Sequence, residues 1–215
     1  MRRSSPLALV LALALSTFAC TRGSGVHGSE VREVGEFTAL GVDGALVVNV
    51  AVGLVTRVEV SGDDNIVPEV RTRVDGGVLR VEMPTGSITT TLPLTVIVAT
   101  PALHELDVEG ASTVDVRGVS GERFDVELEG ASVVDLRGEV QTLDADVEGA
   151  STLRANELTA HTAEIEASGA SRVEVSVSDS LRAEASGAST IRYRGEPGTL
   201  KPHVSGASTI EAASE

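Results

Sequence analysis

Apolar and polar residues alternate along most of this chain, and in its second half the alternation is centred on a repeated Gly-Ala-Ser tripeptide. Six copies begin at glycines spaced 20, 19, 20, 18 and 19 residues apart. Positions two, four and six before each glycine, and four and six after it, are mostly Val, Leu, Ile or Ala. The positions between them are mostly polar. A period of two on both sides predicts two strands per repeat, joined at the tripeptide, each with one face in the core.

A two-strand unit of this size cannot bury its apolar face alone, so successive repeats are expected to stack. With parallel strands ~4.8 Å apart, six units make a column roughly 29 Å long. We therefore predict an all-β fold, a right-handed parallel β-helix (β-solenoid) with coils of about 19 residues. The right hand follows the preference of parallel crossovers. The alternative, a left-handed β-helix, is built on strict six-residue repeats, which the two-residue period does not match.

The predicted organisation has four parts. Residues 1–20 form a lipoprotein-type signal peptide and residues 21–30 a flexible tether; residues 31–100 form an N-terminal β region, as first coils or a cap, and residues 101–215 the repeat β-helix. Within the N-terminal region, short alternating runs bounded by Gly, Asp, Asn or Pro predict strands. These runs are Phe37–Val42, Ala45–Val50, Thr56–Val60, Glu69–Val74, Val78–Met83 and Leu94–Val98.

The first twenty residues have the form of an export signal. Arg2 and Arg3 precede a short apolar run, Leu7 to Leu15, which is too short to span a bilayer as a mature helix. Cys20, the only cysteine, follows the small residue where cleavage would occur. This resembles a lipoprotein signal, and we expect an exported protein, lipid-anchored through Cys20 in the bacterial cell envelope, at the outer membrane. Simple secretion with a spare thiol remains the alternative.

Composition and charge narrow the function classes. The 215 residues carry a formal charge of −15, and only 2% of them are aromatic. A core without large rings suits a narrow stacked interior of small branched side chains. The acidic balance repels nucleic acid, so nucleic-acid binding is not expected.

The tripeptide is interpreted as a structural corner. Glycine supplies a backbone angle that a Cβ would forbid, alanine fills a tight inner bend, and stacked serine hydroxyls form a hydrogen-bonded ladder. A nucleophilic serine is disfavoured because no histidine recurs beside it. The corner residues are Gly110, Ala111, Ser112, Gly130, Ala131, Ser132, Gly149, Ala150, Ser151, Gly169, Ala170, Ser171, Gly187, Ala188, Ser189, Gly206, Ala207 and Ser208.

Acidic residues recur at fixed offsets before the glycines. If the coils are in register, they form neighbouring columns on one outer face, where like charges repel and raise each other's pKa. The main column is Asp107, Glu127, Asp146, Glu166 and Glu184, followed by His203, and a second is Glu105, Asp125, Asp144 and Glu164. Two readings stay open: a solvated face that opposes aggregation, and a weak divalent-cation face. A row of carboxylates is not a calcium cage, so no metal site or cofactor is expected.

Two further motifs have a chemical reading beside a structural one. Asp115 and Asp135, with Arg117 and Arg137 beside them, have the placement of acid–base carboxylates in a polysaccharide-cleaving β-helix. Sugar grooves need aromatic platforms, however, and the chain offers only Tyr193 on this strand series, while Asp and Arg at successive outer positions are more often surface ion pairs. No catalytic residue is therefore assigned. The sequence Gly62-Asp63-Asp64-Asn65 is read as a capped turn between strands rather than a metal loop.

Several of these motifs together resemble a known bacterial family. They are Arg32-x-Val34-x-x-Phe37-x-x-Leu40-x-Val42-x-Gly44, Val58-x-Val60-x-Gly62-Asp63-Asp64-Asn65-Ile66, Val70-x-Thr72-x-Val74-x-x-Gly77-x-Leu79-x-Val81, Thr100-Pro101-x-Leu103 and the Gly-Ala-Ser repeats. Over about residues 32 to 212 the chain resembles the "putative auto-transporter adhesin, head GIN domain" family. The resemblance implies a secreted or lipid-anchored β-helical protein, with adhesion suggested by the family name, and it transfers no catalytic residue.

The function expected from the sequence is that of a non-enzymatic cell-envelope lipoprotein, a β-helical binding, adhesion or structural module. The alternative is a carbohydrate-active β-helix enzyme acting on polysaccharide. Expected partners are the membrane, through the Cys20 lipid, and a protein or glycan ligand of the envelope. A solenoid end is an open sheet edge, so self-association through the C-terminal end is also predicted.

Overall fold

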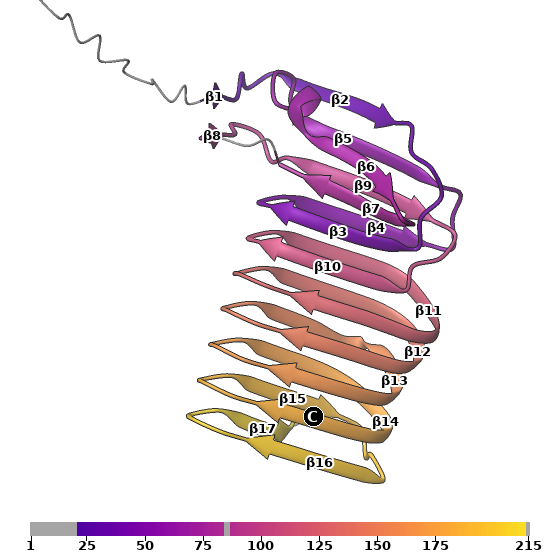
Figure 1. The fold of residues 1–215 in the computed structure, drawn as a ribbon, viewed down its shortest axis with the longest axis vertical. Helices are drawn as coiled ribbons and strands as arrows, with labels where there is room; N and C mark the ends of the chain where they lie inside the picture. Colours follow the sequence, from indigo (N-terminus) through magenta and orange to yellow (C-terminus); the bar gives the residue numbers. More distant parts are fainter. Residues whose placement is uncertain (1–20, 84–86, 214–215) are drawn as a thin grey trace, which may run out of the picture.

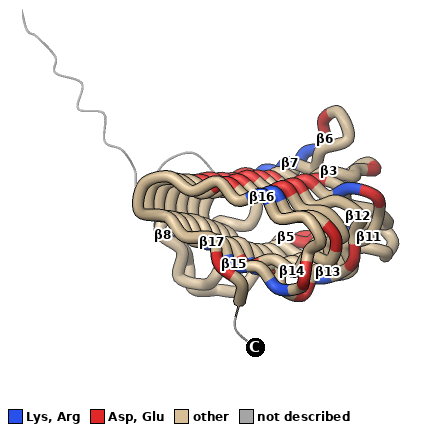
Figure 2. Tube along the Cα trace, turned by 90° about the horizontal axis from the view of Figure 1, so that it is seen from below, with Lys and Arg blue, Asp and Glu red and all other residues tan. Residues whose placement is uncertain are grey.

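The chain winds into a column of stacked β-strands (Figure 1). The structure is a computed structural model, and it describes residues 21–83 and 87–213. Seen along its axis, the column is flattened, with two sheets facing each other across a narrow core (Figure 2). In the described part of the chain the single helical element is one 3-10 turn, Val67–Glu69.

In the middle coils of the repeat half, one long strand runs from each Gly-Ala-Ser corner to the next, and every pairing between coils is parallel. Residues four after the glycine stack in one line, for example Val114, Val134 and Leu153. The predicted β-solenoid is thereby confirmed. Its strands are β10 (Glu105–Gly110), β11 (Thr113–Leu128), β12 (Val133–Val147), β13 (Thr152–Ala167), β14 (Arg172–Ala185), β15 (Thr190–Arg194), β16 (Thr199–Val204) and β17 (Thr209–Ala212).

The core is a set of aliphatic columns that run along the axis. One column passes through Leu106, Val126, Ala145, Ile165 and Ala183, each no more than 4% exposed. Because the inner space is narrow, small and branched side chains fill it, and Phe124 is the largest of the fully buried side chains. The low aromatic content therefore follows from the geometry of the coil.

The N-terminal half contains both coils and a closing layer. Strands β3 (Ala39–Gly44) and β4 (Val47–Val52) continue the parallel stack on β10 and β11, and β7 (Val78–Glu82) and β9 (Thr95–Thr100) continue it further. Three strands then pair antiparallel: β6 (Arg71–Asp75) on β7, β5 (Arg57–Asp63) on β9, and β2 (His27–Arg32) on β5. Antiparallel strands cover the sheet edges at this end.

The flexible tether expected over residues 21–30 is wrong. Strand β1 (Thr21–Arg22) pairs with β8 (Ile88–Thr89), and β2 begins at His27. The alternation of apolar and polar residues did not predict this ordered segment, because side chains at the end of β5 and in the turn after it hold much of it. The predicted leader, residues 1–20 with Cys20, lies outside the described residues. Within the described residues, no helix is long and apolar enough to cross a membrane.

Candidate functional site

Each Gly-Ala-Ser corner packs directly on the corner of the preceding coil. Gly149 and Gly169 have φ of +77° and +76°, in the left-handed region that favours glycine. The amide of Ala170 donates to the carbonyl oxygen of Gly149 at 2.7 Å, and that of Ala188 to Gly169 at the same distance. The corner thus needs glycine for its backbone angle and for this close approach.

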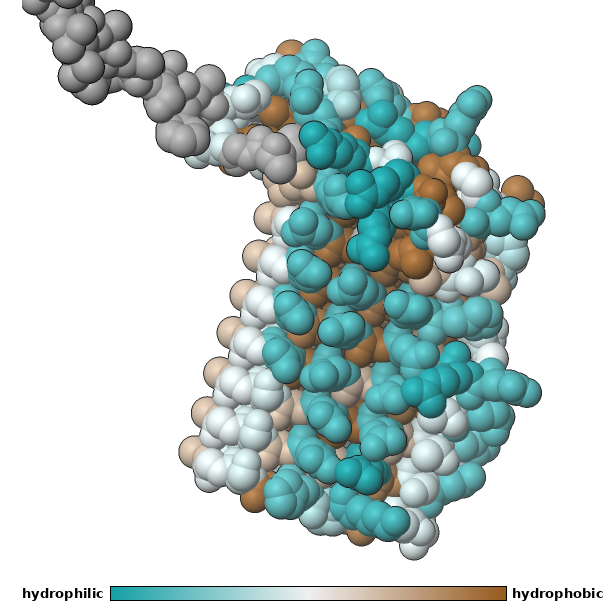
Figure 3. Space-filling view, viewed as in Figure 1, coloured by the Kyte–Doolittle hydropathy of each residue, from teal (hydrophilic) through white to brown (hydrophobic). Residues whose placement is uncertain are grey.

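The serines point inward and the alanines outward. Five corner serines, Ser112, Ser132, Ser151, Ser171 and Ser189, are at most 2% exposed. The alanines of these corners are exposed, so the expectation that alanine fills the inner bend is wrong. Figure 3 shows the resulting edge as a row of pale side chains along the column. Each inward serine therefore places a hydrogen-bonding hydroxyl at the corner, where the strands place apolar side chains.

The serines form the expected ladder from coil to coil. The amide of Ser112 donates to Ser132 Oγ at 3.3 Å, and the amide of Ser132 donates to Ser151 Oγ at 3.3 Å. The hydroxyl of Ser132 donates to the Gly110 carbonyl at 3.2 Å. These hydroxyls satisfy buried backbone groups, which gives the tripeptide a structural role.

The acidic columns are in register. Asp107 pairs with Glu127, Glu127 with Asp146, Asp146 with Glu166, and Glu166 with Glu184. Figure 2 marks the acidic residues in red, and they form a stripe along the side of the column that carries β3, β7 and β16. We call this surface the acidic face; its residues are Asp43, Glu105, Asp107, Glu109, Asp125, Glu127, Glu129, Asp144, Asp146, Glu148, Glu164, Glu166 and Glu184.

Burial and mutual repulsion disturb the titration of the N-terminal part of the acidic face. Partial burial raises the pKa of Asp107, and neighbouring carboxylates add to this although Arg80 opposes it. The charge of Asp107 raises the pKa of Glu109. Burial, then neighbouring carboxylates, raise the pKa of Glu127 and of Asp146. The charged form of these four carboxyls is therefore disfavoured, and a cationic ligand would offset this electrostatic penalty.

The acidic face is a row of carboxylates, not a cage. Among residues 21–83 and 87–213 no group of three or more His, Cys, Asp or Glu side chains is arranged to hold a metal ion. Calcium requires six to eight oxygens around one point. Weak cation binding along the row stays a prediction.

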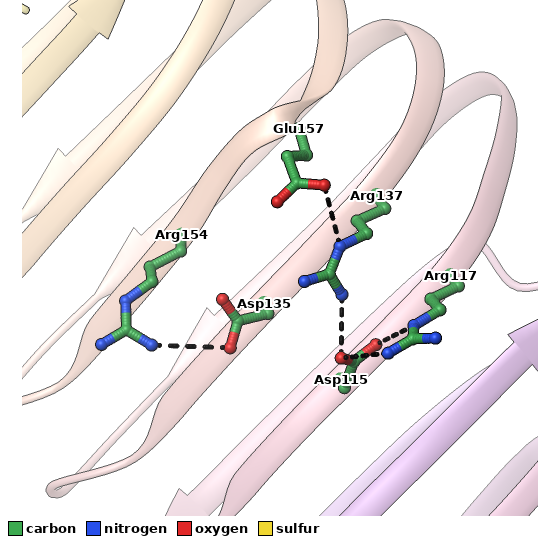
Figure 4. A network of polar contacts seen from close by, with 6 residues as sticks. All are labelled: Asp115, Arg117, Asp135, Arg137, Arg154 and Glu157. Carbon is green, nitrogen blue, oxygen red and sulfur yellow. Dashed lines mark hydrogen bonds and ion pairs between the residues drawn. The ribbon is translucent and has the colours of Figure 1, made fainter.

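On the opposite face, arginines and carboxylates form a network (Figure 4). Asp115 accepts from Arg117 at 2.9 and 3.1 Å and from Arg137 at 2.8 Å, and Arg137 also reaches Glu157 at 3.0 Å. Asp135 lies 3.5 Å from Arg154. The hydrogen bond from Arg117, with help from Arg137 and against burial, lowers the pKa of Asp115. A glycosidase acid needs the opposite shift, so Asp115 does not fit that role.

A hollow of about 420 Å³ lies near the C-terminal end of this opposite face. Its lining includes Asn156, Glu174, Arg192, Arg194 and Glu211. Above it the register between β13 and β14 shifts from Ala155 to Thr159. Sequence reasoning missed the hollow because a bulge leaves the two-residue period on both sides unchanged; the unequal repeat lengths were the available signal.

The Gly62-Asp63-Asp64-Asn65 sequence forms a turn that binds backbone, as interpreted from its residue types. Asp63 is fully buried, and its carboxylate accepts from the amides of Gly25, Thr91 and Leu92 at 2.7, 2.8 and 3.0 Å. Burial acts to raise the pKa of Asp63, but these three N–H groups outweigh it and lower the pKa. Its partners lie nearly thirty residues or more away along the chain, so the sequence alone did not identify them.

Comparison with known proteins places the fold. A family model described as "Putative auto-transporter adhesin, head GIN domain" matches residues 36–197. A "putative adhesin" from Bacteroides fragilis is similar with a TM-score of 0.75 at 19% identity, over 89% of this chain and 99% of that one. A "Putative lipid binding protein" from Parabacteroides distasonis gives 0.61 at 17% identity, over 91% and 100%.

A third solved structure, a "putative adhesin" from Parabacteroides merdae, has a TM-score of 0.51 at 17% identity, over 90% of this chain and 99% of that one. At these identities the solved structures show the fold alone. No curated protein matches the chain at a significant level. Since the family model spans most of the sequence, including the strands from β3 to β9 and five complete Gly-Ala-Ser corners, the chain belongs to the "Putative auto-transporter adhesin, head GIN domain" family.

Proposed function

We propose that this protein is a non-enzymatic, adhesin-like binding module held at the bacterial cell envelope by a lipid on Cys20. The family and the neighbouring folds support a surface or envelope role. The lipid anchor rests on the sequence of the leader, which ends in Ser-Thr-Phe-Ala before Cys20. Outer-membrane placement belongs to the same proposal.

The acidic face is the binding surface in this proposal. The observation that carries it is the register of its carboxylates, which repeat at strand spacing along a rigid sheet. A surface with this charge attracts a cationic protein segment, and neutralising the strained carboxylates stabilises the complex. The corner serines take no part, because they are buried in backbone hydrogen bonds.

Binding of an oligolysine peptide to the mature protein tests this role. We expect affinity that falls as salt is raised, because the attraction is between exposed charges. The double variant Glu127→Gln, Asp146→Asn should weaken binding. The double variant Asp135→Asn, Glu174→Gln removes the same charge from the opposite face and should change binding little. If both double variants weakened binding equally, the peptide would be attracted by net charge alone, and the acidic face would not be the binding site.

Self-association through the C-terminal end is the second part of the proposal. Leu200 and Val204 in the last coil are 41% and 46% exposed. An open coil end exposes both unpaired backbone groups and core side chains, and a second copy of the chain can cover both. The measurement is the sedimentation coefficient over a range of concentrations.

A further inference from the structure

The segment that follows Cys20 is fixed to the N-terminal end of the solenoid by a set of hydrogen bonds. We call residues 21–26 the N-terminal clamp segment. The amide of Ser24 donates to Asn65 Oδ1 at 2.9 Å, and Asn65 Nδ2 donates to the carbonyl of Arg22 at 2.9 Å. The Ser24 hydroxyl donates to Asp64 at 2.6 Å. The amide of Thr21 donates to the carbonyl of Ser87 at 2.9 Å, so the segment is held from its first residue onward.

Buried contacts add to these exposed bonds. The amide of Gly25 donates to the fully buried carboxylate of Asp63. The amide of Gly23 donates to the carbonyl of Thr89 at 2.8 Å, and the Thr91 hydroxyl donates to the carbonyl of Gly23 at 3.0 Å. A β-carbon on Gly23 would overlap the Asp63 carboxylate, so the chain lies directly against that side chain. Such a segment cannot act as a flexible spacer.

We infer that the N-terminal end of the solenoid is a membrane-seating surface: it lies against the lipid bilayer, and the column stands away from it. This rests on the proposed lipidation of Cys20. A lipid on Cys20 would be one residue from the clamp segment, so the bilayer has to meet this end of the column. In Figure 1 the clamp segment and β2 lie at the end of the column opposite β16 and β17.

Exposed apolar side chains gather at this same end. Val31, Leu54 and Val55 are 58%, 55% and 88% exposed. Val31 and Val55 line one hollow of about 540 Å³, together with Val34, Arg32 and Arg57. In Figure 3 the larger brown areas lie in the upper part of the column, over the N-terminal strands. Glu33 also lines this hollow, and both arginines are ion-paired, Arg32 with Glu30 at 2.9 Å and Arg57 with Glu59 at 2.8 Å. The exposed apolar side chains are therefore what suits this surface to the boundary between acyl chains and headgroups.

The charge distribution favours the same orientation. Residues 21–100 contain six arginines and ten carboxylates, whereas residues 101–215 contain nine basic residues and 22 carboxylates. An anionic bilayer repels the repeat half more strongly than the N-terminal half. A column lying flat would bring the repeat half to the lipid, so an upright column is preferred.

Height above the bilayer is the direct test. Ala111 and Ala207 are exposed alanines at the same edge of the column, five coils apart, a difference of about 24 Å along the axis. An azide-bearing amino acid at either position is labelled with a donor dye, and energy transfer is measured to acceptor lipid in phosphatidylethanolamine–phosphatidylglycerol vesicles. We expect the label at position 207 to lie about 24 Å farther from the bilayer. Equal heights would overturn the proposal.

Clamp variants separate fixed seating from simple tethering. Asn65→Ala removes two exposed clamp bonds, and Asp63→Ala removes the buried acceptor; both should broaden the distance distribution at position 207. Asp75→Ala, at the end of β6, removes one carboxylate from the same half and should leave the distribution narrow. Since Asp63→Ala risks misfolding, Asn65→Ala is the deciding variant. An unchanged distribution in Asn65→Ala would show that the clamp does not set the orientation.

Contact of the N-terminal end with lipid and lipidation of Cys20 are measured in separate experiments. The chain contains no tryptophan, so Val55→Trp and Val204→Trp each provide a single fluorophore, at opposite ends. We expect a blue shift on vesicles only for Val55→Trp; a shift only for Val204→Trp would overturn the seating. The mass of the N-terminal peptide tests lipidation of Cys20. If Cys20 carries no lipid, the anchor is wrong, and the height test is repeated with the Cys20 thiol coupled to a maleimide lipid.

Discussion

The carbonyl oxygen of Gly149 lies 2.5 Å from the point where a β-carbon on Gly169 would stand. The same oxygen accepts the amide of Ala170 at 2.7 Å. Neither coil can move away without breaking this hydrogen bond, so both the left-handed φ and the lack of a side chain are required at Gly169. The repeated glycine thus encodes the distance between coils.

Gly169→Ala should lower the free energy of unfolding by roughly 2–5 kcal/mol, the sum of the left-handed backbone penalty and an overpacking cost. Gly76→Ala is the control: Gly76 has a φ of +60° but no neighbour within 4 Å of its added β-carbon. It should lose only about 1–2 kcal/mol. Denaturant unfolding measures both. Equal losses in the two variants would mean that the backbone angle alone explains why glycine is required at position 169.

Ser151→Ala tests the serine ladder. It removes the acceptor of the Ser132 amide, which lies 3.3 Å away in a buried corner, so we expect a loss of about 1–3 kcal/mol. Ser120 is exposed at the variable corner, and Ser120→Ala should stay within ±0.5 kcal/mol. Thermal or denaturant unfolding compares them. A neutral Ser151→Ala would show that the hydroxyl adds nothing to the corner.

The two faces should respond to neutralisation with opposite signs. The folded-state pKa of Asp107 is raised, so its charged form destabilises the fold, and Asp107→Asn should gain up to about 1 kcal/mol at neutral pH. The folded-state pKa of Asp115 is lowered, so its charge stabilises the fold above the unfolded-state pKa, and Asp115→Asn should lose about 1 kcal/mol.

Both differences should vanish in acid. The gain of Asp107→Asn fades as pH falls through the raised pKa of Asp107, because the wild-type carboxyl is then neutral too. The loss of Asp115→Asn fades as pH falls through its unfolded-state and then its lowered folded-state pKa. Urea unfolding from pH 7 to pH 3 measures both curves. Parallel curves at all pH values would rule out titration of these carboxyls as the cause.

The clamp segment should open in acid before the repeats do. The lowered pKa of Asp63 means that its stabilising charge is present above the unfolded-state pKa and lost as pH falls through the folded-state value. The protection factors of the Gly25, Thr91 and Leu92 amides, which are exchange rates corrected for the intrinsic effect of pH, should therefore fall at low pH, while that of the corner amide of Ala170 stays high. An equal fall at Ala170 would indicate global unfolding instead.

The repeat half was predictable because every coil carries the same signal. Alternation fixes which side chains face the core, and the glycine spacing fixes where each coil turns, so register follows from counting along the sequence. The roles of alanine and serine were harder to assign. Either fits a tight corner by size, and only the direction of the backbone shows that Ser132 points inward and Ala131 outward.

The clamp segment was not predictable for a different physical reason. Its order comes from groups about 40 residues away: Asp63 and Asn65 bind its backbone, and Asp64 binds the Ser24 hydroxyl. Burial of its own side chains is not the cause. A polar, glycine-rich segment therefore has the composition of a linker but not its freedom. The acidic columns were visible in the sequence, whereas the burial that raises the pKa of Asp107 was not.

Pro202 governs the strength of the predicted self-association. The amide of Ser205 donates to the carbonyl of Ala185 at 2.9 Å, so the odd-numbered residues of β16 direct their backbone N–H and C=O groups toward β14. The backbone groups of the even-numbered residues Leu200, Pro202 and Val204 therefore point to the open end. Proline has no N–H, so the exposed edge of β16 lacks one hydrogen-bond donor.

Pro202→Thr restores this donor and should strengthen self-association in sedimentation velocity, whereas Val204→Lys should abolish it by placing charges at the contact. A wild-type chain that stays monomeric at millimolar concentration, or a Pro202→Thr variant that associates no more than wild type, would show that the C-terminal end is not the contact.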